Sequence, residues 1–128
     1  MNIKSSQTLV KEALIEITTI SPSRALEMSN NNECNLIDIR DTVELQKLGR
    51  IENSFHISRG LLEFSIHPES AYVQNNNLDI NKEIVLFCAA GGRSALAAKT
   101  LKEMGFEKVS HIEGGFENMS NSGFKVIK

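Results

Sequence analysis

The sequence predicts an α/β fold in which helices cover both faces of a mostly parallel sheet of about five strands, preceded by an extra N-terminal helix. Short β-branched runs alternate along the chain with segments of helical periodicity, which is typical of a parallel sheet. The run at residues 83–88 is apolar throughout and indicates a central strand buried on both faces. The length of 128 residues fits one domain with a sizeable core.

Apolar spacing and capping residues define the elements of the first half. Ser21 caps a helix whose first residue is Pro22, and Gly49 ends the following helix. Two Asn triplets, Asn30–Asn32 and Asn75–Asn77, are expected in loops because Asn tolerates left-handed backbone. The expected elements are a helix at residues 6–16, a strand at 17–20, a helix at 22–29, a strand at 34–40, a helix at 42–48 and a strand at 54–58.

Glycine and proline divide the second half in the same way. His67-Pro68 stops one or two helical turns, Gly105 stops a long helix, and Gly114-Gly115 opens a last helical segment. The expected elements are helical turns at residues 60–66, a strand at 83–88, a helix at 92–104, a strand at 109–113 and a helix after residue 114.

The charge balance excludes some classes of function. The chain has 14 Lys and Arg residues against 16 Asp and Glu, a formal net charge of −2, whereas nucleic-acid binding requires clustered positive charge. We therefore expect no nucleic-acid partner. No apolar run approaches the ~18 residues of a transmembrane helix. The first segment carries Glu12 and Glu16, so we expect no signal peptide, no membrane partner and a cytoplasmic location.

Cys88 lies where a parallel sheet places its sites, because ligands bind beyond the carboxyl ends of strands in open α/β folds. The residues that join it to the next helix are small, basic or hydroxylic: Ala89, Ala90, Gly91, Gly92, Arg93 and Ser94. The glycines let backbone N–H groups turn toward one point, and with a helix N-terminus they form an anion site. A helix N-terminus and a nearby arginine favour a thiolate. We predict a Cys88 thiolate at neutral pH; the alternative is a buried, inert cysteine.

The other cysteine and the histidines are expected to be structural. Cys34 opens a strand and is followed by neither a glycine loop nor a helix start. His56, His67 and His111, expected to be structural or surface residues, share no ligand spacing with either cysteine, so no metal is expected. The apolar stripe of residues 6–16 indicates either a dimer face or, more commonly, packing against its own domain.

These features resemble the single-domain rhodanese-like family over about residues 17–127. The first motif, C-A-A-G-G-R-S at residues 88–94, is similar to the C-x-x-G-x-R-S active loop of these sulfurtransferases. The other matching motifs are L-I-D-I-R at 36–40 with Glu44 and Gly49-Arg50-Ile51, R-G-L-L-E-F at 59–64, and G-G-F at 114–116. The resemblance implies a three-layer rhodanese-like fold at residues 17–128 after a helical extension at 1–16.

Some positions depart from the family pattern. They are Arg50 in place of His, Glu52-Asn53 in place of Pro-Gly, Ser58 in place of Pro, Met119 in place of Trp and Lys125 in place of Pro. The departures concern packing and turns and leave the cysteine loop intact. Asn53 can adopt the positive φ of the glycine that it replaces.

The resemblance implies a persulfide cycle that needs no metal or cofactor. Cys88 would take the outer sulfur of a small donor such as thiosulfate and pass it to a thiol acceptor, including a sulfur-accepting protein. Arg93 is expected to hold the anionic end of the donor. Asp38 and Arg40 are expected to support the loop as an ion pair or to flank the pocket. Arg59 would be a second anion contact or a solvated side chain.

Other functions stay open at this point. The related cell-cycle dual-specificity phosphatases use a Cys-x5-Arg loop, so a phosphatase or an arsenate reductase is one alternative. Cys88 and Arg93 form a Cys-x4-Arg loop, and the shorter loop suits a sulfur atom better than a phosphate. A persulfide carrier or a regulatory binding module is the other alternative. Regulatory members usually lack the cysteine, so the presence of Cys88 favours chemistry.

Overall fold

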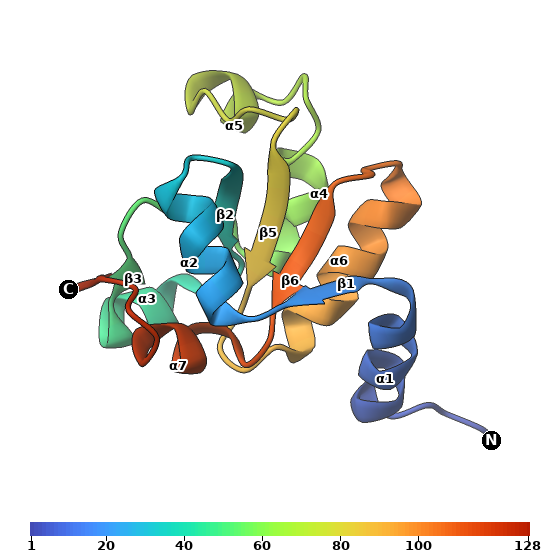
Figure 1. Cartoon of the computed structure of the whole chain (residues 1–128). Helices are drawn as coiled ribbons and strands as arrows, with labels where there is room; N and C mark the ends of the chain where they lie inside the picture. Colours follow the sequence, from blue (N-terminus) through green and yellow to red (C-terminus); the bar gives the residue numbers. More distant parts are fainter.

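Five parallel strands form the centre of the computed structural model, which describes residues 1–128 (Figure 1). They are β1 (Thr18–Ile20), β2 (Cys34–Asp38), β4 (Phe55–His56), β5 (Glu83–Phe87) and β6 (Val109–Ile112). Their spatial order is β1-β6-β5-β2-β4. The predicted fold class, an α/β fold with a parallel sheet of about five strands, is confirmed.

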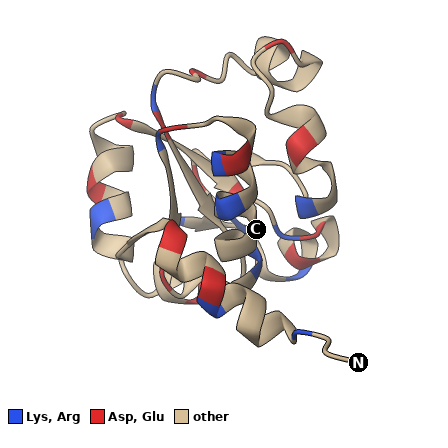
Figure 2. Ribbon diagram, turned by 90° about the vertical axis from the view of Figure 1, so that its right-hand side faces the viewer, with Lys and Arg blue, Asp and Glu red and all other residues tan.

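Helices cover both faces of this sheet (Figure 1). One face carries α4 (Leu62–Ser65), α5 (Ala71–Asn75) and α6 (Gly92–Met104), and α1 (Ser6–Glu16) packs against α6. The other face carries α2 (Pro22–Asn30) and α7 (Gly115–Ser120). The helix α3 (Thr42–Leu48) follows β2, and the 3-10 turn η1 (Arg59–Leu61) leads into α4. Acidic and basic residues are interspersed over these helices (Figure 2).

The central strand β5 contributes to the cores on both sides of the sheet. Ile84 and Leu86 pack under α4, α5 and α6, whereas Val85 and Phe87 pack under α2 and α7. All four side chains are almost completely buried. Burial of a side chain of this size contributes about 1.5–3 kcal/mol, so this strand is strongly fixed in the fold. The position of the residue that follows it, Cys88, is fixed with it.

The asparagine-rich segments partly match their expectations. Asn32 and Asn77 adopt positive φ values of 56° and 52°, as turn residues do, and Asn53 has a φ of 65° in place of the family's glycine. However, Asn30 and Asn75 are the last residues of α2 and α5, so each triplet begins inside a helix. In both cases the left-handed residue lies two positions after the last helical residue and turns the chain out of the helix.

The structure also contains elements that the sequence did not predict. The helix α5 is one, and a two-stranded antiparallel sheet of β3 (Arg50–Ile51) and β7 (Val126–Ile127) is another. The predicted strands at 34–40 and 54–58 are shorter than expected. The first ends at Asp38 because the Arg40 N–H turns back to the Asp38 carboxylate, 3.0 Å away.

Candidate active site

Cys88 directly follows β5 at the carboxyl end of the sheet. Because β6 and β2 flank β5, this cysteine lies in the middle of the edge where open α/β sheets bind ligands. A loop of three residues follows, and α6 begins at Gly92. Cys88 is only 1% exposed, so its sulfur lies at the base of the loop and is reached through a pocket.

Backbone N–H groups converge on the Cys88 sulfur. Gly91 N donates to Sγ over 3.2 Å and Ser94 N over 3.3 Å, and Ser94 Oγ lies 3.6 Å from the same atom. Gly91 has a φ of +110°, a left-handed backbone that a side chain would strain. Two N–H donors and the N-terminal end of α6 therefore stabilise negative charge at this sulfur.

The N-terminal residues of α7 hold the beginning of the loop. Phe116 N donates to the Cys88 carbonyl over 2.8 Å, and Glu117 N donates to the Ala89 carbonyl over 3.2 Å. Gly115 approaches so closely that a Cβ on it would lie 2.3 Å from the Cys88 carbonyl oxygen. The G-G-F motif is thus explained by close contact between α7 and the cysteine loop.

A chain of polar side chains leads from the sulfur to the edge strand β1. Ser94 Oγ lies 2.9 Å from His111 Nδ1, and His111 Nε2 lies 3.0 Å from Thr19 Oγ1. Burial lowers the pKa of His111, which keeps its imidazole neutral at neutral pH. We expected only a structural or surface role for His111. The signal that could have revealed this contact is the pair of polar residues, Ser110 and His111, between the apolar ends of a buried strand.

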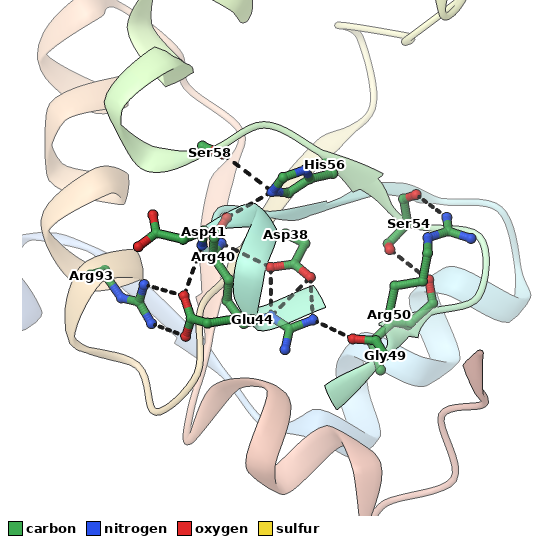
Figure 3. Close-up of polar contacts among 11 residues, drawn as sticks. Asp38, Arg40, Asp41, Glu44, Gly49, Arg50, Ser54, His56, Ser58 and Arg93 are labelled. Carbon is green, nitrogen blue, oxygen red and sulfur yellow. Dashed lines mark hydrogen bonds and ion pairs between the residues drawn. The ribbon is translucent and has the colours of Figure 1, made fainter. Parts of the chain in front are cut away.

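Arg93 forms a two-pronged ion pair with Glu44 of α3 (Figure 3). Its Nη1 and Nη2 lie 2.8 and 2.9 Å from the two carboxylate oxygens. Glu44 also accepts from Asp41 N over 2.8 Å, which caps α3. The hydrogen bonds from Arg93 lower the pKa of Glu44 to about 2, and Glu44 raises the pKa of Arg93. The arginine expected to hold a donor anion therefore already has a carboxylate partner.

Asp38 and Arg40 form a fully buried ion pair beside the loop (Figure 3). Arg40 Nη2 lies 2.8 Å from Asp38 Oδ2 and also donates to the Gly49 carbonyl over 2.9 Å. The guanidinium lies 3.9 Å from the ring centroid of Phe116. This pair ties the end of β2 to the end of α3 and to α7, and neither residue lines the Cys88 pocket.

The remaining candidates make contacts away from the cysteine loop. Arg59 pairs with Glu63 over 2.6 Å, and its Nη2 lies 3.4 Å from Thr100 Oγ1. His56 Nε2 is hydrogen-bonded to the Arg40 carbonyl over 2.7 Å (Figure 3). Cys34 lies at the opposite end of the sheet, and burial raises the pKa of its thiol to about 11.

The pocket at Cys88 has a volume of about 320 Å³. Ala89, Ala90, Gly92 and Arg93 of the loop line it together with Leu96 of α6, while α1 contributes Ser6 and Val10. The chain holds no cluster of three or more His, Cys, Asp or Glu residues that could bind a metal ion. None of its helices combines the length and apolarity needed to span a bilayer.

Residues 21–122 match the Rhodanese-like domain. The chain belongs to the rhodanese-like family. Its curated relatives include the thiosulfate sulfurtransferase GlpE of Glaesserella parasuis serovar 5, which is 31% identical over 109 residues, covering 85% of this chain and 92% of GlpE. The predicted resemblance is therefore confirmed.

Solved rhodanese-like structures and their neighbours agree with this fold. A Rhodopseudomonas palustris protein of unknown function, RPA3614, described as a possible tyrosine phosphatase, is 36% identical with a TM-score of 0.86. The alignment covers 99% of this chain and 97% of RPA3614. The polysulfide-sulfur transferase homodimer of Wolinella succinogenes is 34% identical with a TM-score of 0.72, covering 93% of this chain and 84% of that one.

Proposed function

We propose that this protein is a sulfurtransferase that carries a sulfane sulfur on Cys88 and moves it from a small donor such as thiosulfate to a thiol acceptor. The observation that carries this proposal is the Cys88 sulfur at the end of the central strand, within 3.3 Å of two N–H donors at the start of α6. The family relatives that are sulfurtransferases by name support the same reaction class.

The proposed first half-reaction forms a persulfide. The Cys88 thiolate attacks the outer sulfur of thiosulfate, the sulfur–sulfur bond of the donor breaks, and sulfite leaves with the bonding electron pair. The product is a Cys88 persulfide whose outer sulfur carries the negative charge. The N–H groups of Gly91 and Ser94 and the dipole of α6 stabilise charge on the sulfur in the free enzyme.

The proposed second half-reaction returns the free thiolate. An acceptor thiolate attacks the outer sulfur, the bond to the Cys88 sulfur breaks, and Cys88 leaves as a thiolate. The N–H groups of Gly91 and Ser94 already point at the Cys88 sulfur and stabilise that charge. Arg93 lines the pocket and is the cation available to a donor anion, which has to share its guanidinium with Glu44.

Intact mass measurement tests this proposal. Treatment with thiosulfate should add one sulfur atom to the wild-type chain but not to Cys88→Ser, and cyanide should remove it. Loading followed by slow cyanide turnover would identify a sulfur carrier rather than a turnover enzyme. A folded protein with a reduced Cys88 that gains no mass from thiosulfate or polysulfide contradicts the proposal.

A phosphatase is the second candidate, because RPA3614 is described as a possible tyrosine phosphatase and aligns with nearly the whole chain. In this chain only four residues separate Cys88 from Arg93, one fewer than in the Cys-x5-Arg loop of the dual-specificity phosphatases, and the shorter loop favours sulfur chemistry over the cradling of a phosphate. Cys88-dependent hydrolysis of p-nitrophenyl phosphate, absent from Cys88→Ser, would reverse this order.

A further inference from the structure

The helix α1 forms one wall of the Cys88 pocket. Ser6 and Val10 line the pocket opposite Leu96 and the loop alanines. Val10 Cγ2 lies 3.8 Å from the position that a Cβ on Gly92 would occupy, so its side chain packs directly against the first residue of α6. The match to the family begins only at residue 21, so this wall lies outside the matched domain.

This wall is fixed relative to the cysteine loop. Ser5 caps α1, and Ala13 is fully buried where α1 packs along α6 (Figure 1). At the other end of α1, Lys102 Nζ donates to the Glu16 carbonyl, and Lys99 Nζ lies 3.4 Å from the Glu16 carboxylate. Because α6 begins in the cysteine loop, contacts along α6 hold Val10 at a set distance from Cys88.

The pocket lining is mainly apolar apart from Ser6 and the guanidinium of Arg93. Val10, Leu96 and the two loop alanines supply aliphatic surface, and the guanidinium of Arg93 is paired with Glu44. Cys88 itself is 1% exposed. A sulfur donor that reaches Cys88 through this pocket passes between α1 and the loop, where an unbranched chain of sulfur atoms needs less room than a peptide.

We propose that Val10 is a specificity-determining residue, and that α1 restricts the Cys88 pocket to slender inorganic donors of sulfane sulfur, excluding bulky peptide persulfides such as glutathione persulfide. This inference rests on the proposed function and names the substrate class for it. In the pocket, the terminal sulfur of the donor lies against Val10 and Leu96 while Cys88 attacks it. The bonds formed and broken are those of the first half-reaction above.

Cysteine alkylation tests whether Val10 of α1 restricts access to Cys88, and it does not depend on sulfur transfer. In a Cys34→Ser background only Cys88 reacts, and its rates with iodoacetamide and with bulky fluorescein maleimide are compared. Val10→Ala should raise the maleimide rate by about tenfold, as expected for the loss of two methyl groups from a pocket wall. The iodoacetamide rate should change less than about twofold. Ile15→Ala is the matched control, because Ile15 is on the same helix but 85% exposed.

The opposite substitution and the donors themselves complete the test. Val10→Trp should slow both reagents, and the maleimide more. Val10→Ala should raise the loading rate from glutathione persulfide relative to thiosulfate, measured by intact mass. Equal effects on both reagents, or the same effect from Ile15→Ala, overturn the proposal, as does an unchanged loading ratio. Thermal unfolding confirms that each variant is folded. If neither donor loads Cys88, the proposed function fails, while the alkylation ratio still decides whether α1 is the barrier.

Discussion

At the scale of single residues, Glu44 partly neutralises the positive charge of Arg93 in the cysteine loop. Its carboxylate holds both terminal nitrogens of Arg93 and also caps α3. One side chain therefore both caps the start of α3 and pairs with the arginine of the Cys88 loop. Variants of this pair separate the two effects.

The pair should contribute stability that depends on pH. The pKa of Glu44 is lowered from 4.5 to about 2 in the folded chain, so its contribution is full above about pH 4.5 and is lost as the pH falls toward 2. Glu44→Gln should reduce the free energy of unfolding by about 1 kcal/mol at neutral pH, since the pair is partly exposed and screened by solvent. The difference from wild type should vanish near pH 2 in urea titrations.

The matched control for this stability prediction is Glu27→Gln. Glu27 pairs with Arg24 over 2.8 Å, but both side chains are far more exposed than Glu44. Its effect on the free energy of unfolding should stay below about 0.5 kcal/mol. Because Gln can still accept the capping hydrogen bond from Asp41 N, an acid-insensitive difference for Glu44→Gln would contradict a stabilising role of the carboxylate charge.

The same pair should change donor affinity in opposite directions. Arg93→Ala removes the cation of the pocket and should raise the KM for thiosulfate severalfold, while Glu44→Gln releases that cation from its partner and should lower it. Steady-state kinetics with thiosulfate and cyanide measure both. If the two variants raise KM alike, Arg93 acts only by ordering the loop.

The sequence allowed the position of Cys88 and its loop to be predicted, but not the residues from other elements that contact the loop. Cys88, the glycines and Ser94 lie in one continuous segment, so a strand, a small-residue loop and a helix start were enough to place them. Glu44 lies 49 positions from Arg93, and His111 lies 17 positions from Ser94. Such contacts depend on how the elements pack, which local patterns do not encode.

At the scale of elements, the N-terminal end of α7 packs directly against the cysteine loop at Gly115. Its backbone N–H groups hold the carbonyls of Cys88 and Ala89, and a Cβ on Gly115 would come within 2.3 Å of one of these oxygens. Gly115→Ala should therefore cost about 3 kcal/mol in free energy of unfolding, because it adds a backbone clash to left-handed strain. It should also slow the alkylation of Cys88 by moving the loop.

Gly105→Ala is the control that distinguishes the steric clash at Gly115 from the backbone strain of a positive φ. Gly105 also has a positive φ, of 108°, but no atom lies within 4 Å of the position of its Cβ. The substitution should cost only about 1–2 kcal/mol and leave Cys88 alkylation unchanged. Equal losses of stability and reactivity in the two variants would show that α7 does not position the loop.

The longest elements were the most predictable, and the elements that were missed are all short. The helix α6 and the strand β5 carry enough residues for periodicity and apolarity to identify them. The strands β3 and β7 have two residues each and lie far apart in the sequence, so neither has a pattern of its own. The helix α5 has five residues and stops in an asparagine run, which favoured a loop.

At the scale of the whole molecule, Arg40 joins parts of the chain that are far apart in sequence. It lies two residues after β2, donates to the Gly49 carbonyl at the end of α3 and stacks on Phe116 of α7. Both Arg40 and Asp38 are 0% exposed. The guanidinium can be accommodated in this core only because Asp38 balances its charge.

Asp38→Ala should therefore destabilise the whole fold and not the pocket alone. It leaves a buried guanidinium without its carboxylate, at a cost of about 3–5 kcal/mol in free energy of unfolding. That cost is a large share of the roughly 5–15 kcal/mol that stabilises a domain. Urea denaturation measures it, with Arg24→Ala, which breaks an exposed pair, as a control expected to stay below about 1 kcal/mol.

Replacing both Asp38 and Arg40 shows whether the ion pair itself stabilises the fold or whether Asp38 only compensates the buried charge of Arg40. Asp38→Leu combined with Arg40→Met removes the buried charges together and should recover most of the stability lost in Asp38→Ala, because an apolar pair needs no compensation. If the double variant is as unstable as Asp38→Ala, the hydrogen bond to Gly49 and the contact with Phe116 carry the energy instead. The buried arginine would then stabilise this fold through its contacts across three elements, and the carboxylate would only keep its charge neutral.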